Sequence, residues 1–404
     1  MKKKMYIFGL AGMLSLVGIT PAFAGSSVPE IETLKQQMQQ IIQENQNLRS
    51  RVSQLEEERQ KVGEATISDK VLEDKIHKVY EQRMEDEDFA HKINKYVEFS
   101  GLIEVEASAA DDFEGADSSG FELATVELGF DAQVTDWAKG HVLVLYEEGG
   151  DDDVVIDEGY ITLGNTEKFP LYLNAGRLYV PFGNFETNMI SDPLTLEIAE
   201  TQETALQVGF EAAGAYGSVF AFNGDTNEGG GDSQIEQFGA NIGYTLEQEG
   251  FSVDVGMSYM NSIGDSDGLS GILEEEDMLE VDYVGGIGAY VIAHIGPVEL
   301  IGEYITALDD FDDADDSQPM AFNAEAGYTF DIKGMESTVA VAYQGTDDMA
   351  GNLPESRILA SFGIGIFEGT TLAFEYAHDE DYDEADGGTD ESADTFTAQL
   401  AYEF

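Results

Sequence analysis

The sequence predicts an all-β transmembrane barrel of about 16 antiparallel strands, preceded by an N-terminal α-helical coiled coil. Three observations predict this fold. After residue 96 apolar residues recur at every second position, short and long connections alternate between these segments, and before residue 63 apolar residues recur at heptad spacing. We expect a signal peptide at 1–24, a coiled-coil rod at 25–63, a helical connector at 64–95 and the barrel at 96–404.

The charge of the chain is large and uneven. Of its 404 residues, 81 are Asp or Glu and 19 are Lys or Arg, which gives a formal net charge of −62. Residues 1–95 hold 14 of the basic residues and 15 of the acidic ones. A phosphate backbone requires a basic surface, so the charge argues against a nucleic-acid partner. Because the chain has no Cys, it has no disulfide framework and no thiolate metal site.

The first residues have the pattern of a secretory signal peptide. Lys2–Lys4 precede an apolar run over Met5–Thr20, and the small residues Ala22 and Ala24 come just before Gly25. The alternative is a retained membrane anchor, but the run is short and the cleavage pattern is complete.

The segment after the signal has the heptad pattern of a coiled coil. Asn45 at a core position is a polar residue of the kind that fixes register and strand number. An isolated helix of this length is marginal, so we expect self-association, as a trimer, of a rod in the periplasm. The alternative is a lone helix packed on its own domain. The expected core positions are Ile31, Leu34, Met38, Ile41, Asn45, Leu48, Val52 and Leu55.

The barrel is expected from half-buried strands of membrane-crossing length. The clearest alternation covers Val97–Ala107, Ala124–Val134, Phe251–Tyr259, Phe322–Ile332 and Phe396–Phe404. The last of these segments ends with aromatic Tyr402 and Phe404, which we interpret as a signal for the barrel-assembly machinery.

The connections between strands sort into two classes. Short ones are expected at 136–140, 165–170, 248–250, 296–297, 333–335 and 368–370. Long acidic ones are expected at 111–120, 147–153, 224–232, 262–280, 309–317, 346–355 and 378–394. A soluble sandwich has no reason to sort its loops by length onto two sides, whereas an outer-membrane barrel does.

The rows opposite the apolar rows are acidic and are expected to line a pore that favours cations. Arg177 is also expected to point inward, because a lipid-facing Arg at depth costs about 2–4 kcal/mol. There it would form a structural ion pair or a substrate contact. The expected pore-lining carboxylates are Glu98, Glu104, Glu106, Glu127, Asp131, Asp254, Glu325 and Asp331.

One acidic run is a candidate for calcium binding, with Asp265-Ser266-Asp267-Gly268 as a second. Neither has the spacing of an EF-hand loop, so loosely bound divalent counter-ions are the alternative to a specific site, and no other cofactor is expected. The carboxylates of the run are Asp309, Asp310, Asp312, Asp313, Asp315 and Asp316.

Residues 174–200, NAGRLYVPFGNFETNMISDPLTLEIAE, with Phe-Asn-Gly at 222–224, resemble the LbtU-type siderophore porins. The resemblance implies an outer-membrane barrel with an N-terminal coiled coil, involved in uptake of an iron–siderophore complex. It also implies a family-specific strand end and loop, in which Arg177 is joined by Tyr179, Pro181, Phe182, Gly183, Asn184, Phe185, Asp192 and Pro193.

We therefore expect a passive or ligand-facilitated porin in the outer membrane of a Gram-negative bacterium, in contact with lipid and lipopolysaccharide. A polycarboxylate siderophore would be repelled by an acidic lumen, so a general cation-selective porin is an alternative. A barrel that only anchors a rod reaching the cell wall is another. The five histidines form no Ser/His/acid pattern, so an enzyme is not expected.

Overall fold

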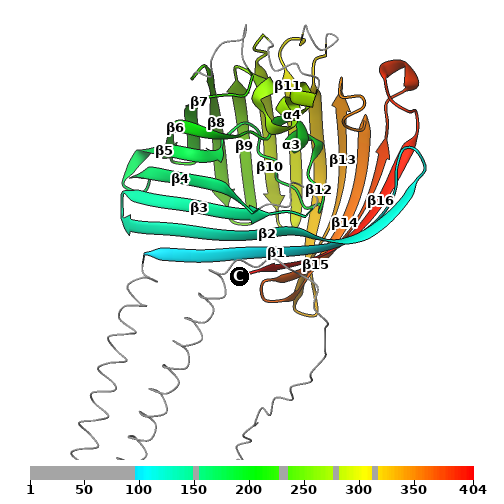
Figure 1. Ribbon diagram of the computed structural model, residues 1–404. Coiled ribbons are helices and arrows are strands. Elements are labelled where there is room, and N and C mark those ends of the chain that lie inside the picture. The colour runs from blue at the N-terminus through cyan, green and yellow to red at the C-terminus, as the bar shows by residue number, and fades with distance from the viewer. Residues whose placement is uncertain (1–95, 149–153, 227–234, 276–281, 312–316) are drawn as a thin grey trace, which may run out of the picture. The chain divides into compact units, whose positions relative to one another are not determined.

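The computed structural model describes residues 96–148, 154–226, 235–275, 282–311 and 317–404. These residues form one closed barrel of 16 antiparallel strands (Figure 1). The strands are β1 (Val97–Asp111), β2 (Asp117–Thr135), β3 (Ala138–Tyr146), β4 (Val155–Asn165), β5 (Phe169–Tyr179), β6 (Gln202–Ala212), β7 (Ala215–Phe222), β8 (Gln237–Gln248), β9 (Phe251–Met260), β10 (Gly286–Ile295), β11 (Val298–Ala307), β12 (Met320–Ile332), β13 (Met335–Asp347), β14 (Ser356–Phe367), β15 (Thr370–Glu380) and β16 (Ser392–Glu403). Short helices lie in the connections: α3 (Leu194–Ala199), η2 (Ile263–Asp265), α4 (Asp267–Glu275) and η3 (Glu384–Asp386).

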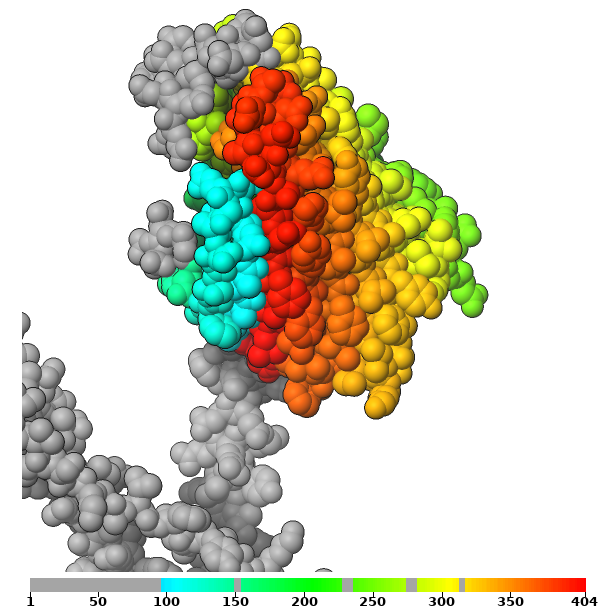
Figure 2. Space-filling model, turned by 90° about the vertical axis from the view of Figure 1, so that its right-hand side faces the viewer, coloured from blue at the N-terminus to red at the C-terminus, as the bar shows by residue number. Residues whose placement is uncertain are grey.

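The barrel closes between its first and last strands. Tyr402 of β16 pairs with Ile103 of β1, and Figure 2 shows β1 lying directly beside β16. Phe404 continues this pairing, because its backbone N–H donates to the Gly101 carbonyl at 3.0 Å and its carbonyl accepts from Gly101 at 2.9 Å. The predicted barrel of 16 antiparallel strands is confirmed. The predicted coiled-coil core, from Ile31 to Leu55, lies outside the described residues.

Several strands run further than the alternation predicts. β1 continues to Asp111 and β2 begins at Asp117, so half of the expected connection at 111–120 is paired strand. β15 and β16 likewise run into the two ends of the expected connection at 378–394, because β15 ends at Glu380 and β16 begins at Ser392. The alternating pattern fades in these parts because a hairpin that projects beyond an apolar layer meets water on both faces, whereas the backbone pairing continues unchanged.

The outer face of the barrel is an apolar belt. On β1, Ile103 and Val105 are exposed, while Glu104 and Glu106 between them are half-buried on the opposite face. Because side chains alternate along a strand, this fixes the acidic row on the inside. A closed barrel satisfies every backbone group within the sheet, which is what a lipid environment requires.

The largest buried cluster lies inside the barrel. The inward rows were expected to be mostly acidic, but near the long-connection ends of β5–β12 many inward side chains are apolar and pack with residues of α3 and α4. Figure 1 shows α3 and α4 near that end of the barrel. The cluster therefore joins the wall to segments that occupy the interior. Its largest fully buried members include Phe182, Phe222, Leu194, Ile198, Met260, Ile263 and Ile305.

Candidate functional site

The connection between β5 and β6 folds into the barrel; we call residues 180–201 the inner loop. Its base is closed by the backbone N–H of Val180, which donates to the Thr201 carbonyl at 2.9 Å and so extends the pairing of the two strands. Between these residues the chain crosses the interior, and it returns through α3 (Figure 1). The inner loop therefore narrows the passage through the barrel.

The turn into the interior is made by Gly183 and Phe185. Gly183 has φ +86°, and Phe185 is a non-glycine residue with φ +62°. A Cβ on Gly183 would lie 2.3 Å from the Phe185 ring, so the ring packs where only glycine leaves room. Pro181 precedes this turn and fixes its own φ, which limits the directions open to the chain.

A wall carboxylate receives the entering chain. Glu303 of β11, 6% exposed, accepts the backbone N–H of Asn184 at 2.6 Å and that of Phe185 at 3.2 Å. The same carboxylate accepts the Thr195 hydroxyl at 2.7 Å. Hydrogen bonds to a charged acceptor are stronger than neutral ones, so Glu303 ties the loop to the wall both before and after its turn.

Glu325 of β12 holds the next part of the inner loop. Its oxygens accept the Asn188 backbone N–H at 2.8 Å, the Asn188 side-chain amide at 2.7 Å and the Thr187 hydroxyl at 2.7 Å. Only 5% of Glu325 is exposed. Glu325 was predicted to line the pore; its side chain does point inward, but the inner loop covers it.

Two further wall residues, on β15 and β13, also accept hydrogen bonds from the inner loop. Glu375 of β15 accepts the backbone N–H of Ile190 at 2.5 Å and of Ser191 at 3.2 Å. Gln344 of β13 accepts the Leu194 N–H at 3.2 Å. The inner loop thus follows the wall from β11 to β15 and leaves the opposite side of the interior open.

The second helix in the interior, α4, packs against α3. Gly268 lies so close to it that a Cβ would be 1.8 Å from the Glu197 carbonyl oxygen. The Asp267 N–H donates to the Glu200 carbonyl at 2.8 Å, and the Ser266 hydroxyl donates to Ile198 at 2.8 Å. The inner loop is therefore held by α4 as well as by the strands of the wall.

The open side of the passage is acidic. Glu104 and Glu106 of β1 and Glu127 of β2 form what we call the acidic wall, and all three are half-buried. Asp192 of the inner loop interacts electrostatically with Glu104 and Glu106. Carboxylates therefore flank the passage on the loop side and on the wall side.

The inner loop holds carboxyl groups whose pKa values are raised. Burial raises the pKa of Asp192, the nearby Glu375 charge raises it further, and Arg357 opposes both effects. Burial, reinforced by Asp267, raises the pKa of Glu200 to about 7. Burial also raises the pKa of Asp267 to about 6. Glu200 and Asp267 therefore titrate closer to neutral pH than ordinary carboxyl groups do, first because they are buried and second because other carboxylates lie near them.

Arg357 of β14 is an inward-facing cation in this region. Its guanidinium binds both oxygens of Asp379 on β15, at 2.8 and 3.1 Å. A bidentate pair of this kind fixes the guanidinium and neutralises one carboxylate. The carboxylates of the acidic wall and of Asp192 form no such ion pair with a described residue, although Glu106 accepts the Gln399 side-chain amide at 2.9 Å.

Other predicted pore residues are engaged with neighbours. Asp131 is 2.9 Å from the Lys139 ammonium and 3.0 Å from His141. Asp254 accepts the hydroxyl of Tyr216 at 2.8 Å. Glu98 and Asp331 lie near the short-connection end of the barrel, where Asp331 accepts the Gly334 N–H at 2.9 Å.

The prediction that Arg177 points inward is wrong. Arg177 pairs with Thr204, and Thr204 is on the same face of β6 as the outward-facing Leu206. Arg177 therefore faces outward, and its Nε donates to the Gln202 side-chain oxygen at 2.6 Å. Gln202 in turn donates to Asp157 at 2.6 Å, and so does the Tyr179 hydroxyl at 3.2 Å. An outward Arg is tolerated here because it ends a strand, where the cost of a charge near the membrane edge is small.

The residues of the predicted family-specific loop come together as one structure. From Pro181 to Pro193 they form the entry and crossing of the inner loop, with Asp192 toward the acidic wall. Sequence reasoning missed Glu303 and Glu375, which hold this loop. The available signal was the connection itself, which is long but lacks the acidic runs of the other long connections.

Only some of the predicted calcium ligands lie in the described part of the chain. Asp309 and Asp310 are exposed, whereas Asp312, Asp313, Asp315 and Asp316 lie outside the described residues. Asp265 is 1% exposed, and its carboxylate accepts the backbone N–H and hydroxyl of Thr226, both at 2.8 Å. Within the described ranges no group of three or more His, Cys, Asp or Glu side chains could hold a metal ion.

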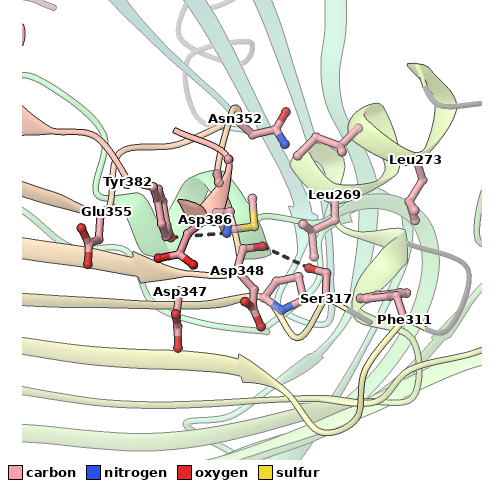
Figure 3. Close-up of a pocket in the computed structure, with 15 residues that line it drawn as sticks. Leu269, Leu273, Phe311, Ser317, Asp347, Asp348, Asn352, Glu355, Tyr382 and Asp386 are labelled. Atoms are coloured by element: carbon pink, nitrogen blue, oxygen red, sulfur yellow. Dashed lines mark hydrogen bonds between the residues drawn. The ribbon is translucent and has the colours of Figure 1, made fainter. Parts of the chain in front are cut away.

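A hollow of about 550 Å³ opens among the long connections (Figure 3). Leu269 and Leu273 of α4 lie on one side, and carboxylates such as Asp347 and Glu355 lie on the other. Its apolar half belongs to the core cluster that also contains Tyr382, whose hydroxyl accepts the Met349 N–H at 3.3 Å. The apolar side chains that line the hollow therefore join α4 to the later connections.

No protein-family model matches the chain. The chain is similar to a UPF0422 protein of Coxiella burnetii, at 29% identity over 302 residues, which cover 71% of this chain and 64% of that protein. It is also similar to the UPF0422 protein lpg2959 of Legionella pneumophila, at 28% identity over 362 residues, covering 76% and 66%. The matches thus span less than two thirds of these relatives' length, and their names state no activity.

Among solved structures, the chain resembles an anion-selective porin from Comamonas acidovorans with a TM-score of 0.55. The likeness covers 76% of this chain and 99% of that one at 13% sequence identity. It establishes the fold, a 16-strand porin barrel. In the part of the chain that the structure describes, no helix has the length and apolarity to span a membrane.

Proposed function

We propose that this protein is a passive outer-membrane channel that prefers cations. The observation that carries the proposal is the position of the inner loop, which wall carboxylates hold on one side of the lumen so that Asp192 faces the acidic wall. Carboxylates on both sides of a narrow passage attract cations and repel anions. The long connections would then face the outside of the cell and the short ones the periplasm.

The cargo is proposed from the same charges. The resemblance to LbtU-type porins suggests an iron–siderophore complex, whereas the names of the similar proteins specify no siderophore. An acidic passage supports a neutral or cationic complex over a polycarboxylate one. A polyanion would have to pass Asp192 and the acidic wall without a compensating row of basic residues.

The surroundings of the protein follow from this proposal. Lipid and lipopolysaccharide would contact the apolar belt, and the aromatic end at Tyr402 and Phe404 would be recognised by the barrel-assembly machinery. The expected rod would lie in the periplasm and bring three copies together.

Planar-bilayer recording of the purified protein tests the channel proposal. We expect stepwise ion currents in KCl that rise in proportion to voltage. A protein that inserts, as judged by protection of its strands from protease, and yet carries no current would contradict the proposal.

A further inference from the structure

Three neighbouring hollows lie along the inner wall between β2 and β10, on the short-connection side of the inner loop. Their volumes are about 750, 490 and 160 Å³. Tyr160 and Tyr172 line the first, Tyr172 and Tyr216 the second, and Tyr216 and Tyr290 the third. We call these four residues the tyrosine row. Because neighbouring hollows share a tyrosine, the three lie side by side, and we call them together the track.

Three rings of the tyrosine row rest on glycines of the wall. A Cβ on Gly209 would lie 2.2 Å from Cζ of Tyr172, and one on Gly243 would lie 2.2 Å from Cζ of Tyr216. Gly256 stands in the same relation to Tyr290, at 2.4 Å from Cε1. A side chain at any of these three glycines would displace the ring, so the glycines allow the rings to lie close against the wall.

The rings are held in place by hydrogen bonds. The Tyr216 and Tyr290 hydroxyls bond each other, and Tyr216 also donates to Asp254 at 2.8 Å. Beside the row, a chain of polar side chains crosses five strands. Its members are Thr162, Asn174, Gln207, Ser218 and Asn241, joined by bonds of 2.6–2.9 Å. Hydrogen bonds therefore fix the Tyr216 and Tyr290 end of the track and the polar side chains beside it.

The charge around the track is negative. Glu167 and Glu211 line both larger hollows. The two lysines of the first hollow are each close to a carboxylate, Lys139 to Asp131 and Lys168 to Asp136. A tyrosine face attracts a cation that lies within about 6 Å of it, so rings and carboxylates favour the same kind of solute.

We infer that the tyrosine row binds organic cations, meaning solutes with an ammonium or guanidinium group on an apolar body. The inference rests on the proposed channel function and names the substrate class of that channel. Hollows of about 500–750 Å³ have the size of small-molecule sites. An inorganic cation needs only the carboxylates, whereas a row of ring faces adds affinity for a solute that is both cationic and apolar.

The test uses benzyltrimethylammonium added to the short-connection side of the reconstituted channel. We expect it to interrupt the K⁺ current, and we expect Tyr172→Ala and Tyr216→Ala to weaken this block about three- to tenfold, the value of one lost cation–π contact. Tyr216→Phe keeps the ring and should keep the block. Gly243→Ala should weaken the block, because it displaces the Tyr216 ring without removing it.

Tyr244→Ala is the matched control, since Tyr244 is next to Gly243 on β8 but faces outward. Equal block in Tyr216→Ala, Tyr244→Ala and the parent protein would overturn the inference, as would equal block by benzoate. Calorimetry of the same cation in detergent gives a readout that needs no conductance. If the channel carries cation-preferring currents but binds the organic cation independently of the tyrosines, only this inference is wrong. If the channel carries no current, the proposed function is wrong.

Discussion

The backbone N–H of Asn184 donates to Oε1 of Glu303 at 2.6 Å, although 119 residues separate them in the chain. The same carboxylate also accepts the Thr195 hydroxyl, so one residue of β11 holds the inner loop where it enters and where it returns. This relationship places the loop against one wall and leaves the acidic wall facing an open passage.

Glu303→Ala should release the inner loop. It leaves two backbone N–H groups and the Thr195 hydroxyl without their acceptor, and each bond to a charged group contributes about 1.5–3 kcal/mol. We expect a lower unfolding temperature and a less regular single-channel conductance. Glu368→Ala, in the short connection between β14 and β15, is the control. Unchanged stability and conductance in Glu303→Ala would show that the loop is held elsewhere.

Gly268→Ala should separate α4 from α3, because the added Cβ would lie 1.8 Å from the Glu197 carbonyl oxygen. Gly271→Ala is a matched control in the same helix, where a Cβ meets nothing within 4 Å and should stabilise the helix by about 0.5–1 kcal/mol. Limited proteolysis of the connection between β9 and β10 distinguishes them. Equal cleavage of the two variants would contradict the packing of α4 on α3.

The contact between α3 and α4 should weaken as pH rises. Folding raises the pKa of Glu200 to about 7 and that of Asp267 to about 6, so the folded state binds more protons than the unfolded state between about pH 4 and 7. Stability from these groups is therefore highest below about pH 4 and is lost toward pH 7. The charges that influence their pKa values are those of Asp157, Asp192, Glu197, Asp225 and Arg177.

Hydrogen exchange of residues 194–201 and 267–273 at pH 5 and pH 8 measures this effect after correction for intrinsic rates. Glu200→Gln, which cannot ionise, should flatten the difference. If the parent protein and Glu200→Gln lost protection equally between the two pH values, the coupling would be absent.

Deletion of Ile31–Val62 should lower the oligomer mass, since heptad core positions in this segment are expected to bring three copies together. Light scattering in detergent, with the detergent contribution subtracted, gives the protein mass. A deletion variant of unchanged oligomer number would assign self-association to the barrel.

Much of the barrel could be predicted because its signals are local. Alternation in segments such as Val97–Ala107 marks a strand wherever it pairs, and connection length distinguishes the two ends of the barrel. The extended ends of β1 and β2 were underestimated, because side chains lose their alternation there while the backbone pairing continues.

The inner loop could not be predicted from local signals. Glu325 and Glu303 follow the same inward pattern as Glu104, and only the position of Asn188 and Asn184 shows that a loop covers the first two. Their hydrogen bonds join residues more than 100 positions apart, and neither partner's neighbours in sequence indicate the other. The apolar interior could not be predicted for the same reason. Inward Ile305 is an exception to the polar inward pattern, and only its packing in one cluster with α3 explains it.

The reversal potential in a tenfold KCl gradient tests the central claim most directly. An acidic passage predicts a potential of the sign given by K⁺ carrying most of the current. Asp192→Asn and Glu127→Gln should each reduce it, and together they should reduce it further, with both variants folded and conducting. A potential near zero, or one set by Cl⁻, in the parent protein would contradict a cation-preferring channel.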